Sequence, residues 1–455
     1  MKNKIIKCFK SYDIRGRVPD ELNAEIAYCI GNAMAKFLGA KTIVLGRDIR
    51  SSSQELADST ANGLMDAGVN VIDIGLCGTE EVYFATGSMD ACGGIMITAS
   101  HNPSDYNGLK LVRENSKPIS SDSGLESIRD HAESNERYLH RKKGKCTQAD
   151  ISTPYIESLL SFINLKSLKP LKVVVNPGNG GASIVVDQMI EYLPFDFIKV
   201  HYEPDAAFPN GVPNPMIEEN RQSTITSVIA NEADLGIAWD GDFDRCFFFD
   251  EKGEFVEGYY IVGLLAKSLL LNNKNARVIY DPRLTWNTIE VVKKHLGKPI
   301  QSRSGHSFIK QSMREEDALY GGEMSAHHYF RDFYYCDSGM IPWLLITELM
   351  SNSGESLSSM IAEYKNNYPV SGEINRSVKD VSAVIRLIRK EYEKDSIHID
   401  TTDGISLEFV DWRFNLRASN TEPLIRLNVE SRGDRKLMQL KTEELLSKIE
   451  NSLRN

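Results

Sequence analysis

The chain has 455 residues, of which 41% are hydrophobic and 25% are charged, and its formal net charge is −10. This length predicts several domains rather than one hydrophobic core, and this composition excludes disordered and fibrous proteins. The net negative charge argues against a nucleic-acid-binding protein, because such a surface repels a phosphate backbone. A small anion could still bind in a local basic pocket.

The seven cysteines are scattered and show no CxxC spacing, so neither a disulfide framework nor a zinc site is expected. The basic N-terminus lacks the apolar segment and cleavage site of a signal peptide. The longest apolar run, 259–271, contains Lys267 and is too short to span a bilayer. These features predict a cytoplasmic protein with reduced thiols and no membrane partner.

Apolar residues over 22–37 recur at helical spacing, and a β-branched run at 42–45 follows them. The same alternation returns further along the chain. Buried strands are expected at 70–74, 94–98, 172–176, 235–239 and 278–280, with helices at 155–162 and 261–270. This order predicts α/β domains with largely parallel sheets.

Shifts in composition predict the joints between domains. Residues 137–153 are polar and basic, 250–253 form a charged turn, and 366–369 carry a helix-ending proline. The expected domains are 1–148, 149–252, 253–368 and 369–455. The basic cluster at 140–145 is interpreted as part of a solvated linker.

The last domain is expected to be α+β, with short strands at 406–410 and 425–429 and a closing helix from Arg435. Two other stretches, 94–112 and 235–249, share the pattern of a strand, a polar loop and a second apolar segment. This pattern suggests a repeated structural unit.

The first loop that carries reactive side chains follows the strand at 94–98 and contains Ser100, His101 and Asn102, with Lys110 further on. Ligands bind beyond the carboxyl ends of strands in open α/β sheets, so Ser100 is a candidate nucleophile. The alternative is a turn whose side chains bond only to the backbone.

The second loop follows the strand at 235–239 and places Asp240, Asp242 and Asp244 at alternate positions. Three carboxylates can converge on one hard divalent cation, and Gly241 would permit the sharp turn. The cation is expected to be Mg²⁺, with Arg245 holding a phosphate nearby. The alternative is a calcium-stabilised or merely solvated acidic turn.

Two further loops carry polar side chains. Residues 321–328 combine flexible glycines with Glu323, Ser325 and His327, groups that suit sugar hydroxyls, although a structural turn is an equal alternative. Residues 417–423 combine Arg417 with small hydroxyl and amide side chains. That combination favours a phosphate site over a capping turn.

The four loops, in this order, resemble those of the α-D-phosphohexomutase superfamily, and within it those of the bacterial phosphomannomutases of GDP-mannose biosynthesis. The likeness extends over essentially the whole chain. It also includes the segments 9–16, 46–50, 280–283 and 305–310.

The resemblance implies three similar α/β domains with mixed, largely parallel sheets and a smaller C-terminal α+β domain around a central cleft. It implies reversible interconversion of mannose 6-phosphate and mannose 1-phosphate through a phosphoserine and a hexose 1,6-bisphosphate. One Mg²⁺ per chain is implied, with the bisphosphate as activator. The chain is expected to be a monomer or a homodimer.

The resemblance also implies the roles of individual residues. The catalytic residues would be Ser100, His101, Lys110, Arg15 and Arg245. The metal ligands would be Ser100, Asp240, Asp242 and Asp244. The substrate-binding residues would be Tyr12, Arg283, His306, Glu323, Ser325, His327, Arg417, Ser419, Asn420 and Thr421.

Two positions depart from the family pattern, because Phe243 and Ala326 stand where many members have glycine. Both departures concern loop shape and sugar preference, since neither removes a ligating side chain. The readable loops do not address the sugar's 2-position, so phosphoglucomutase or dual specificity is the alternative. Two other classes are an aspartyl-nucleophile phosphatase, which would not account for the Ser100 loop, and an inactive sugar-phosphate-binding protein.

Overall fold

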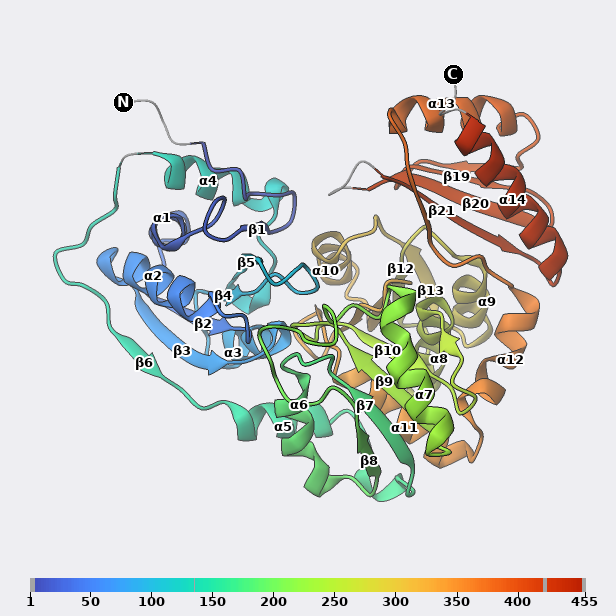
Figure 1. The fold of residues 1–455 in the computed structure, drawn as a ribbon, viewed down its shortest axis with the longest axis horizontal. Coiled ribbons are helices and arrows are strands. Elements are labelled where there is room, and N and C mark those ends of the chain that lie inside the picture. Colours follow the sequence, from blue (N-terminus) through green and yellow to red (C-terminus); the bar gives the residue numbers. More distant parts are fainter. Residues whose placement is uncertain (1–4, 135, 420–423, 452–455) are drawn as a thin grey trace. The chain divides into compact units, whose positions relative to one another are not determined.

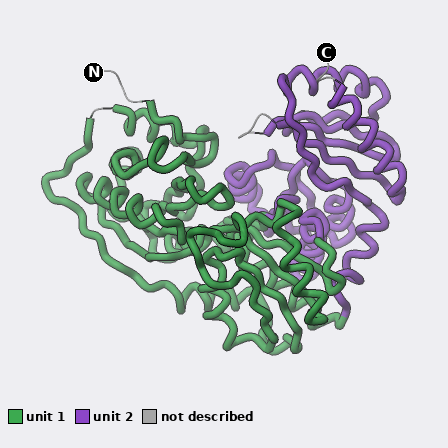
Figure 2. Tube along the Cα trace, viewed as in Figure 1, with its two compact units in different colours: residues 1–255, 327–354 green, residues 256–326, 355–455 purple. Residues whose placement is uncertain are grey.

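The computed structural model describes residues 5–134, 136–419 and 424–451. The chain forms two compact units (Figure 2). Unit 1 contains residues 1–255 and 327–354, and unit 2 contains residues 256–326 and 355–455. These units describe packing, and the four domain boundaries expected from the sequence stay a prediction.

Unit 1 begins with a six-stranded sheet in the order β1-β5-β4-β2-β3-β6 (Figure 1). Its strands are β1 (Ile14–Arg17), β2 (Thr42–Arg47), β3 (Asn70–Leu76), β4 (Gly93–Ile97), β5 (Tyr106–Arg113) and β6 (Cys146–Gln148). β2 is parallel to β3 and β4, whereas β4 is antiparallel to β5. The strands expected at 42–45, 70–74 and 94–98 are thus confirmed.

The short strand β6 corrects the interpretation of 137–153 as a linker throughout. It pairs in parallel with β3 at the edge of the sheet, and all three of its residues are exposed. A three-residue edge strand without a buried face has no alternating apolar pattern, so the sequence carries no signal for it.

Four helices pack with this sheet: α1 (Ala24–Leu38), α2 (Ser53–Asp66), α3 (Thr79–Ser88) and α4 (Leu125–Glu133). At the start of α1 the Asn23 side chain accepts a hydrogen bond from the Ile26 amide, and the helix ends at Gly39 in the left-handed conformation. Buried apolar side chains of α1, α2 and α4 share one core with the sheet.

The second sheet of unit 1 has the order β11-β10-β9-β7-β8. Its strands are β7 (Lys172–Asn176), β8 (Asp196–Lys199), β9 (Leu235–Trp239), β10 (Cys246–Phe249) and β11 (Phe255–Val256), and the nearby helices are α5 (Ser152–Leu160), α6 (Ala182–Met189) and α7 (Gln222–Ala230). β7 is parallel to β8 and β9, and β9 is antiparallel to β10. The pairs β4–β5 and β9–β10 therefore confirm the repeated pattern seen in the sequence.

The segment 327–354 completes unit 1 with an antiparallel pair, β15 (His328–Phe330) and β16 (Cys336–Asp337), and with α11 (Ile341–Ser353). Glu80 of α3 is fully buried and accepts hydrogen bonds from the Gly339 and Met340 amides at the start of α11. Its other oxygen accepts from the hydroxyls of Ser338 and Tyr155. Glu80 therefore joins three distant segments.

Unit 2 contains a parallel set in which β12 (Arg277–Tyr280) pairs with β13 (Lys298–Gln301) and with β14 (Tyr320–Gly322). Its helices are α8 (Gly258–Asn272), α9 (Trp286–Lys294), α10 (His306–Glu315) and α12 (Leu357–Asn367). Gly321 and Gly322, expected to be flexible loop residues, are instead buried in β14. A side chain at Gly321 would meet Met313, so packing explains that glycine.

The C-terminal part of unit 2 is an antiparallel sheet in the order β17-β21-β20-β19-β18. Its elements are β17 (Ile374–Ser377), β18 (His398–Asp400), β19 (Ile405–Glu408), β20 (Trp412–Ala418), β21 (Leu424–Ser431), α13 (Val381–Tyr392) and α14 (Arg435–Asn451). Apolar side chains of both helices and of the sheet form one core. The α+β expectation for this region is confirmed, as is the closing helix.

None of the helices in the described part of the chain combines the length and the apolar character that a membrane crossing demands. All seven cysteines lie within the described residues and carry free thiols, as the sequence predicted, and five of them are buried.

Glu80 predicts a pH dependence of stability. Burial raises the pKa of Glu80 from 4.5 to about 8, despite the four donors that face it. The folded protein therefore retains a proton that the unfolded chain releases, and stability is lost as the pH rises from about 4.5 to about 8, by at most about 1.4 kcal/mol per pH unit. In Glu80→Gln, which mimics the neutral acid, we expect a smaller fall in the melting temperature over this range. Parallel melting curves that fall equally would contradict this assignment.

Candidate active site

Ser100 lies in the loop after β4 and is 2% exposed. Its backbone is in the left-handed region, with φ of 50°, and its amide donates to the Thr98 hydroxyl. A serine in this conformation is strained unless its surroundings hold it. The hydroxyl donates to Oδ2 of Asp240 across 2.8 Å, which links the first predicted loop to the second.

Arg50 holds the Ser100 loop, a role that the sequence analysis missed. Its guanidinium donates to the backbone carbonyls of Ser100 and Asn102 at 2.8 and 2.6 Å, and to those of Pro103 and Tyr106 at 2.6 and 2.9 Å. Arginine is suited to this task because its donors form a rigid planar fork. The segment 46–50 was recognised only as part of the family likeness.

Asp240, Asp242 and Asp244 lie in the loop between β9 and β10, and all three are buried. One oxygen from each can be chosen so that all three lie within 4.8 Å of one another. Their predicted convergence is therefore seen in the structure.

Gly241 has a different role from the one expected. A Cβ there would come within 2.5 Å of the Ser100 carbonyl oxygen, so glycine is needed for close approach of the two loops. The left-handed turn falls instead on Phe243, with φ of 46°. Its buried ring packs over Gly78, beside the start of α3. Ala326 likewise has φ of 70°, so both non-glycine departures occupy conformations that favour glycine.

Lys110 and Thr79 bind the second of these aspartates. Lys110 on β5 donates to Oδ2 of Asp242 at 2.7 Å and to Oδ2 of Asp244 at 2.5 Å. Burial favours the neutral amine, but the two carboxylates together outweigh it and raise the pKa of Lys110. Thr79, which the sequence analysis missed, donates its hydroxyl to Oδ2 of Asp242 at 2.6 Å.

Arg245, His101 and Arg15 surround Ser100. Arg245 donates to Oδ2 of Asp240 at 2.9 Å and to Nδ1 of His101 at 2.5 Å, and that nitrogen lies 2.9 Å from the Ser100 hydroxyl. Burial, followed by the charge of Arg245, holds the pKa of His101 well below its usual range. Arg15 donates to Asn102 in the Ser100 loop at 2.6 Å. These expected catalytic residues therefore lie together.

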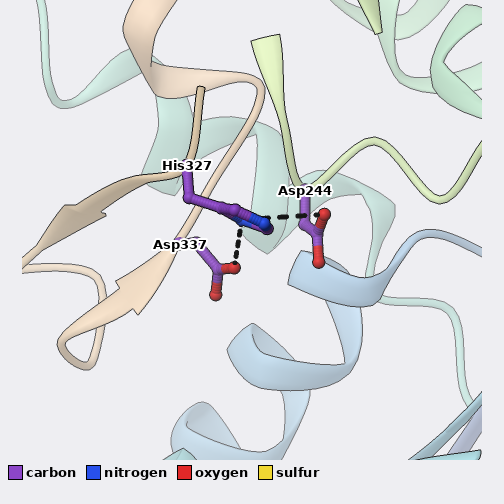
Figure 3. Close-up of side chains that lie close together, drawn as sticks. All are labelled: Asp244, His327 and Asp337. Carbon is purple, nitrogen blue, oxygen red and sulfur yellow. Dashed lines mark hydrogen bonds and ion pairs between the residues drawn. The ribbon is translucent and has the colours of Figure 1, made fainter. Parts of the chain in front are cut away.

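His327, which directly precedes β15, approaches the loop that contains Asp240, Asp242 and Asp244, named the acidic loop (Figure 3). Its Nδ1 is 2.9 Å from Oδ2 of the buried Asp337 and 3.9 Å from Oδ1 of Asp244. His327 was expected to bind substrate together with Glu323 and Ser325 of the 321–328 loop, named the sugar loop. The structure places His327 against the acidic loop within unit 1. A carboxylate bonded to one ring nitrogen fixes the orientation of a histidine.

The acidic loop fits a divalent cation. Oδ1 of Asp242 and Oδ1 of Asp244 are buried, and neither has a hydrogen-bond partner among the described residues. Unpaired buried carboxylate oxygens are unfavourable, and a hard cation with oxygen ligands would satisfy them. Asp240, Asp242 and Asp244, with Ser100 bonded to Asp240, are thus a suitable ligand set for Mg²⁺.

In unit 2, Arg283 organises the loops that follow β12 and β14. Its guanidinium pairs with both oxygens of Asp281 at 2.9 Å, and it donates to Glu323 and Ser325 at 3.2 Å each. The Met324 amide also donates to Asp281. Glu323, Ser325 and Arg283, three of the expected substrate-binding residues, therefore lie together. His306 begins α10 and is half-buried.

Of the expected phosphate ligands, Arg417 lies near the end of β20 and Ser419 directly follows that strand, whereas Asn420 and Thr421 lie outside the described residues. Arg426 on β21 donates to the Ser419 hydroxyl at 3.3 Å. Glu373, a residue absent from the expected site, accepts from Arg417 at 3.0 Å and from Arg426 at 3.1 Å. Only the tertiary structure could place this carboxylate among arginines.

The expected site residues that the structure describes fall into two groups, one in each unit. Unit 1 brings together Ser100, His101, Lys110, Arg15, Arg245, His327 and the three aspartates, and it contains the half-buried Tyr12 just before β1. Unit 2 contains Arg283, His306, Glu323, Ser325, Arg417 and Ser419.

Comparison with protein families gives four matches along the chain. They are phosphoglucomutase/phosphomannomutase alpha/beta/alpha domain I over residues 7–139, domain II over 153–253, domain III over 257–368, and the C-terminal domain over 373–447. Together these matches cover most of the sequence.

Similar proteins span nearly the whole chain. A phosphomannomutase of Escherichia coli is 54% identical over 450 residues, covering 97% of this chain and 99% of the relative. A protein of Xanthomonas campestris named phosphohexose mutases is 55% identical over 444 residues, covering 97% and 98%. A crystal structure of a phosphoglucomutase/phosphomannomutase family protein from Burkholderia thailandensis has a TM-score of 0.88 at 30% identity, covering 98% of this chain and 97% of that one.

Thr79 provides a test of the metal assignment. We expect Thr79→Val to weaken Mg²⁺ binding about tenfold, because losing the hydrogen bond leaves Asp242 less firmly oriented. The matched control is Thr86→Val on the same helix, since the Thr86 hydroxyl is also buried but donates to the Val82 carbonyl. Mg²⁺ titration by calorimetry measures both variants. Equal affinities in Thr79→Val and the wild type would refute the role of Thr79.

Proposed function

Because the chain belongs to the phosphoglucomutase/phosphomannomutase family, we propose that it is a phosphomannomutase, an isomerase that interconverts mannose 6-phosphate and mannose 1-phosphate. The observation that carries the mechanism is the hydrogen bond from the Ser100 hydroxyl to Asp240, inside the acidic loop. The names of the similar proteins support mannose as the sugar. The product would feed GDP-mannose synthesis in the cytoplasm, and the free thiols are consistent with such a compartment.

Ser100 is proposed to carry a phosphoryl group in the resting enzyme. The P–O bond to Ser100 breaks as a P–O bond to the free hydroxyl of the hexose monophosphate forms, and the proton of that hydroxyl passes to a base. The product of this step is a hexose 1,6-bisphosphate. Transfer of its other phosphoryl group back to Ser100 regenerates the phosphoserine.

Charge neutralisation is the main requirement of phosphoryl transfer. Mg²⁺ held by the three aspartates and by Ser100 would neutralise charge on the phosphoryl oxygens. Arg245 lies against Asp240 and His101, within reach of any group attached to the Ser100 oxygen. Arg15, bonded to Asn102, supplies a second positive charge beside the same loop.

The base is best assigned to His327. Lys110 is bonded to Asp242 and Asp244, which hold it in the protonated state, and Nδ1 of His101 accepts a hydrogen bond from Arg245. His327 is instead oriented by the buried carboxylate of Asp337. A histidine fixed in this way can accept a proton and return it.

The bisphosphate must turn end for end between the two transfers. A site that binds the phosphate distant from Ser100 must therefore accept either end of the sugar. We assign this site to Arg417, Ser419, Asn420 and Thr421, and we assign recognition of the sugar hydroxyls to Glu323 and Ser325. Tyr12, Arg283 and His306 complete the proposed substrate contacts.

Replacing Ser100 tests the nucleophile. We expect Ser100→Ala to lose mutase activity by at least about a thousandfold and to take up no label from phosphoryl-labelled hexose 1,6-bisphosphate, because no oxygen remains to carry the group. Ser104→Ala is the matched control, since Ser104 is an exposed serine of the same loop. Labelling of Ser100→Ala on an aspartate would favour a phosphatase-like mechanism. An unlabelled and inactive wild type would favour an inactive binding protein.

A second experiment tests the sugar and the cofactors. We expect kcat/KM for mannose 1-phosphate to exceed that for glucosamine 1-phosphate, with glucose 1-phosphate as the nearest rival, in the presence of Mg²⁺ and a trace of bisphosphate. Removal of divalent cations with a chelator should abolish turnover, and Mg²⁺ should restore it. A higher kcat/KM for glucose 1-phosphate would make the chain a phosphoglucomutase, and activity that survives chelation would refute the metal role.

A further inference from the structure

Glu373 lies at the centre of an arginine cluster in unit 2. It directly precedes β17, and its side chain is 5% exposed. Its carboxylate faces Arg417 at 3.0 Å, Arg426 at 3.1 Å and Arg283 at 3.5 Å. These charges outweigh burial and lower the pKa of Glu373 to about 2. The carboxylate is therefore ionised at neutral pH.

One of these arginines, Arg417, belongs to the proposed phosphate site, and Arg426 lies beside that site. Arg417 is an expected phosphate ligand, and Arg426 also donates to the hydroxyl of Ser419, another expected ligand. A guanidinium presents the same donors to a carboxylate and to a phosphate. A bound phosphate and Glu373 would therefore compete for the same N–H donors of Arg417 and Arg426.

We propose that Glu373 is an internal competitor of the substrate phosphate, which occupies the donors of Arg417 and Arg426 in the unliganded protein and thereby limits the affinity of the site. The proposal rests on the proposed function, because that function identifies the anion as the phosphate of a hexose phosphate. Glu373 acts through the arginines, so it is a positioning residue.

A moderate affinity suits the reaction. The bisphosphate has to leave this site and return with its other end, so a phosphate held too tightly would slow the turn. A carboxylate that re-forms its ion pairs when the phosphate departs lowers the free energy of the released state. Arg283 connects Glu373 with the sugar loop, because its guanidinium contacts Glu373 and also Glu323 and Ser325.

The opposite interpretation is that Glu373 only holds the arginines in place for phosphate. The two interpretations predict opposite signs. If Glu373 competes, removing its charge makes phosphate bind more tightly. If Glu373 only organises the site, removing its charge leaves the arginines disordered and mutually repelling, and phosphate binds more weakly.

The test is calorimetric titration of Glu373→Gln with inorganic phosphate, with metal chelated so that phosphate is not drawn to the acidic loop. We expect the dissociation constant of phosphate to fall about tenfold relative to wild type, because the variant lacks the charged group that competes for the arginine donors. Glu408→Gln is the matched control, because Glu408 pairs with Arg413 in the same sheet at 3.5 Å but lies outside the cluster. The control should bind phosphate like the wild type. Unchanged or weaker binding by Glu373→Gln would overturn the proposal.

A double variant locates the effect. Glu373→Gln combined with Arg417→Ala should lose the gain in affinity, because the competed donors are gone. A gain that persists in the double variant would place the phosphate elsewhere and contradict the proposal. Should Glu373→Gln fail to fold, Glu373→Asp keeps the charge but withdraws it from the arginines. We expect Glu373→Asp to bind phosphate more tightly than wild type, and equal or weaker binding would again overturn the proposal.

Turnover separates this inference from the proposed function. With mannose 1-phosphate as substrate, Glu373→Gln should lower KM and also lower kcat, since a tighter phosphate leaves more slowly. If the wild type has mutase activity but Glu373→Gln binds phosphate no more tightly, only the proposed role of Glu373 is refuted. A wild type without mutase activity refutes the proposed function, whatever the phosphate titration shows.

Discussion

The burial of Asp240, Asp242 and Asp244 in one short loop is the constraint on which the rest of unit 1 depends. Buried charges are unfavourable unless they are paired and hydrogen-bonded. Two cations, Lys110 and Arg245, face these three carboxylates, so negative charge remains for a divalent ion. Lys110 lies on the first sheet, and the aspartates follow a strand of the second. The electrostatic requirement therefore ties the two sheets together where Ser100 must act.

Other buried acidic side chains fix further segments through their hydrogen bonds. Glu80 accepts the amides at the start of α11, and the same segment contains Asp337, which orients His327. In unit 2, Glu430 accepts the Thr285 amide near the start of α9 and also pairs with Arg413. Arg413 in turn donates to the carbonyl of Arg283. Buried acidic side chains thus position His327 in unit 1 and Arg283 in unit 2.

The two units divide the proposed work. Unit 1 contains the proposed nucleophile and metal ligands, which follow β4 and β9, and the proposed proton carrier His327, which directly precedes β15. Unit 2 contains the groups proposed to bind the sugar hydroxyls and the distant phosphate. Glu373 belongs to this second group, because it already pairs with Arg417 and Arg426, the arginines for which we propose that phosphate competes.

The sequence alone determined the buried strands that lead into the reactive loops, the order of those loops and their reactive residue types, since a buried strand followed by Ser100 or by Asp240, Asp242 and Asp244 is a local pattern. Only the tertiary structure revealed the partners, because Thr79 is 163 positions from Asp242 and no periodicity relates them. Arg50 and Glu373 were missed for the same reason. Gly241 was recognised as necessary, but its reason, the Ser100 carbonyl against its Cα, exists only once the two loops meet. Local chemistry can be read along a chain, whereas the compensation of buried charge depends on which distant segments pack together.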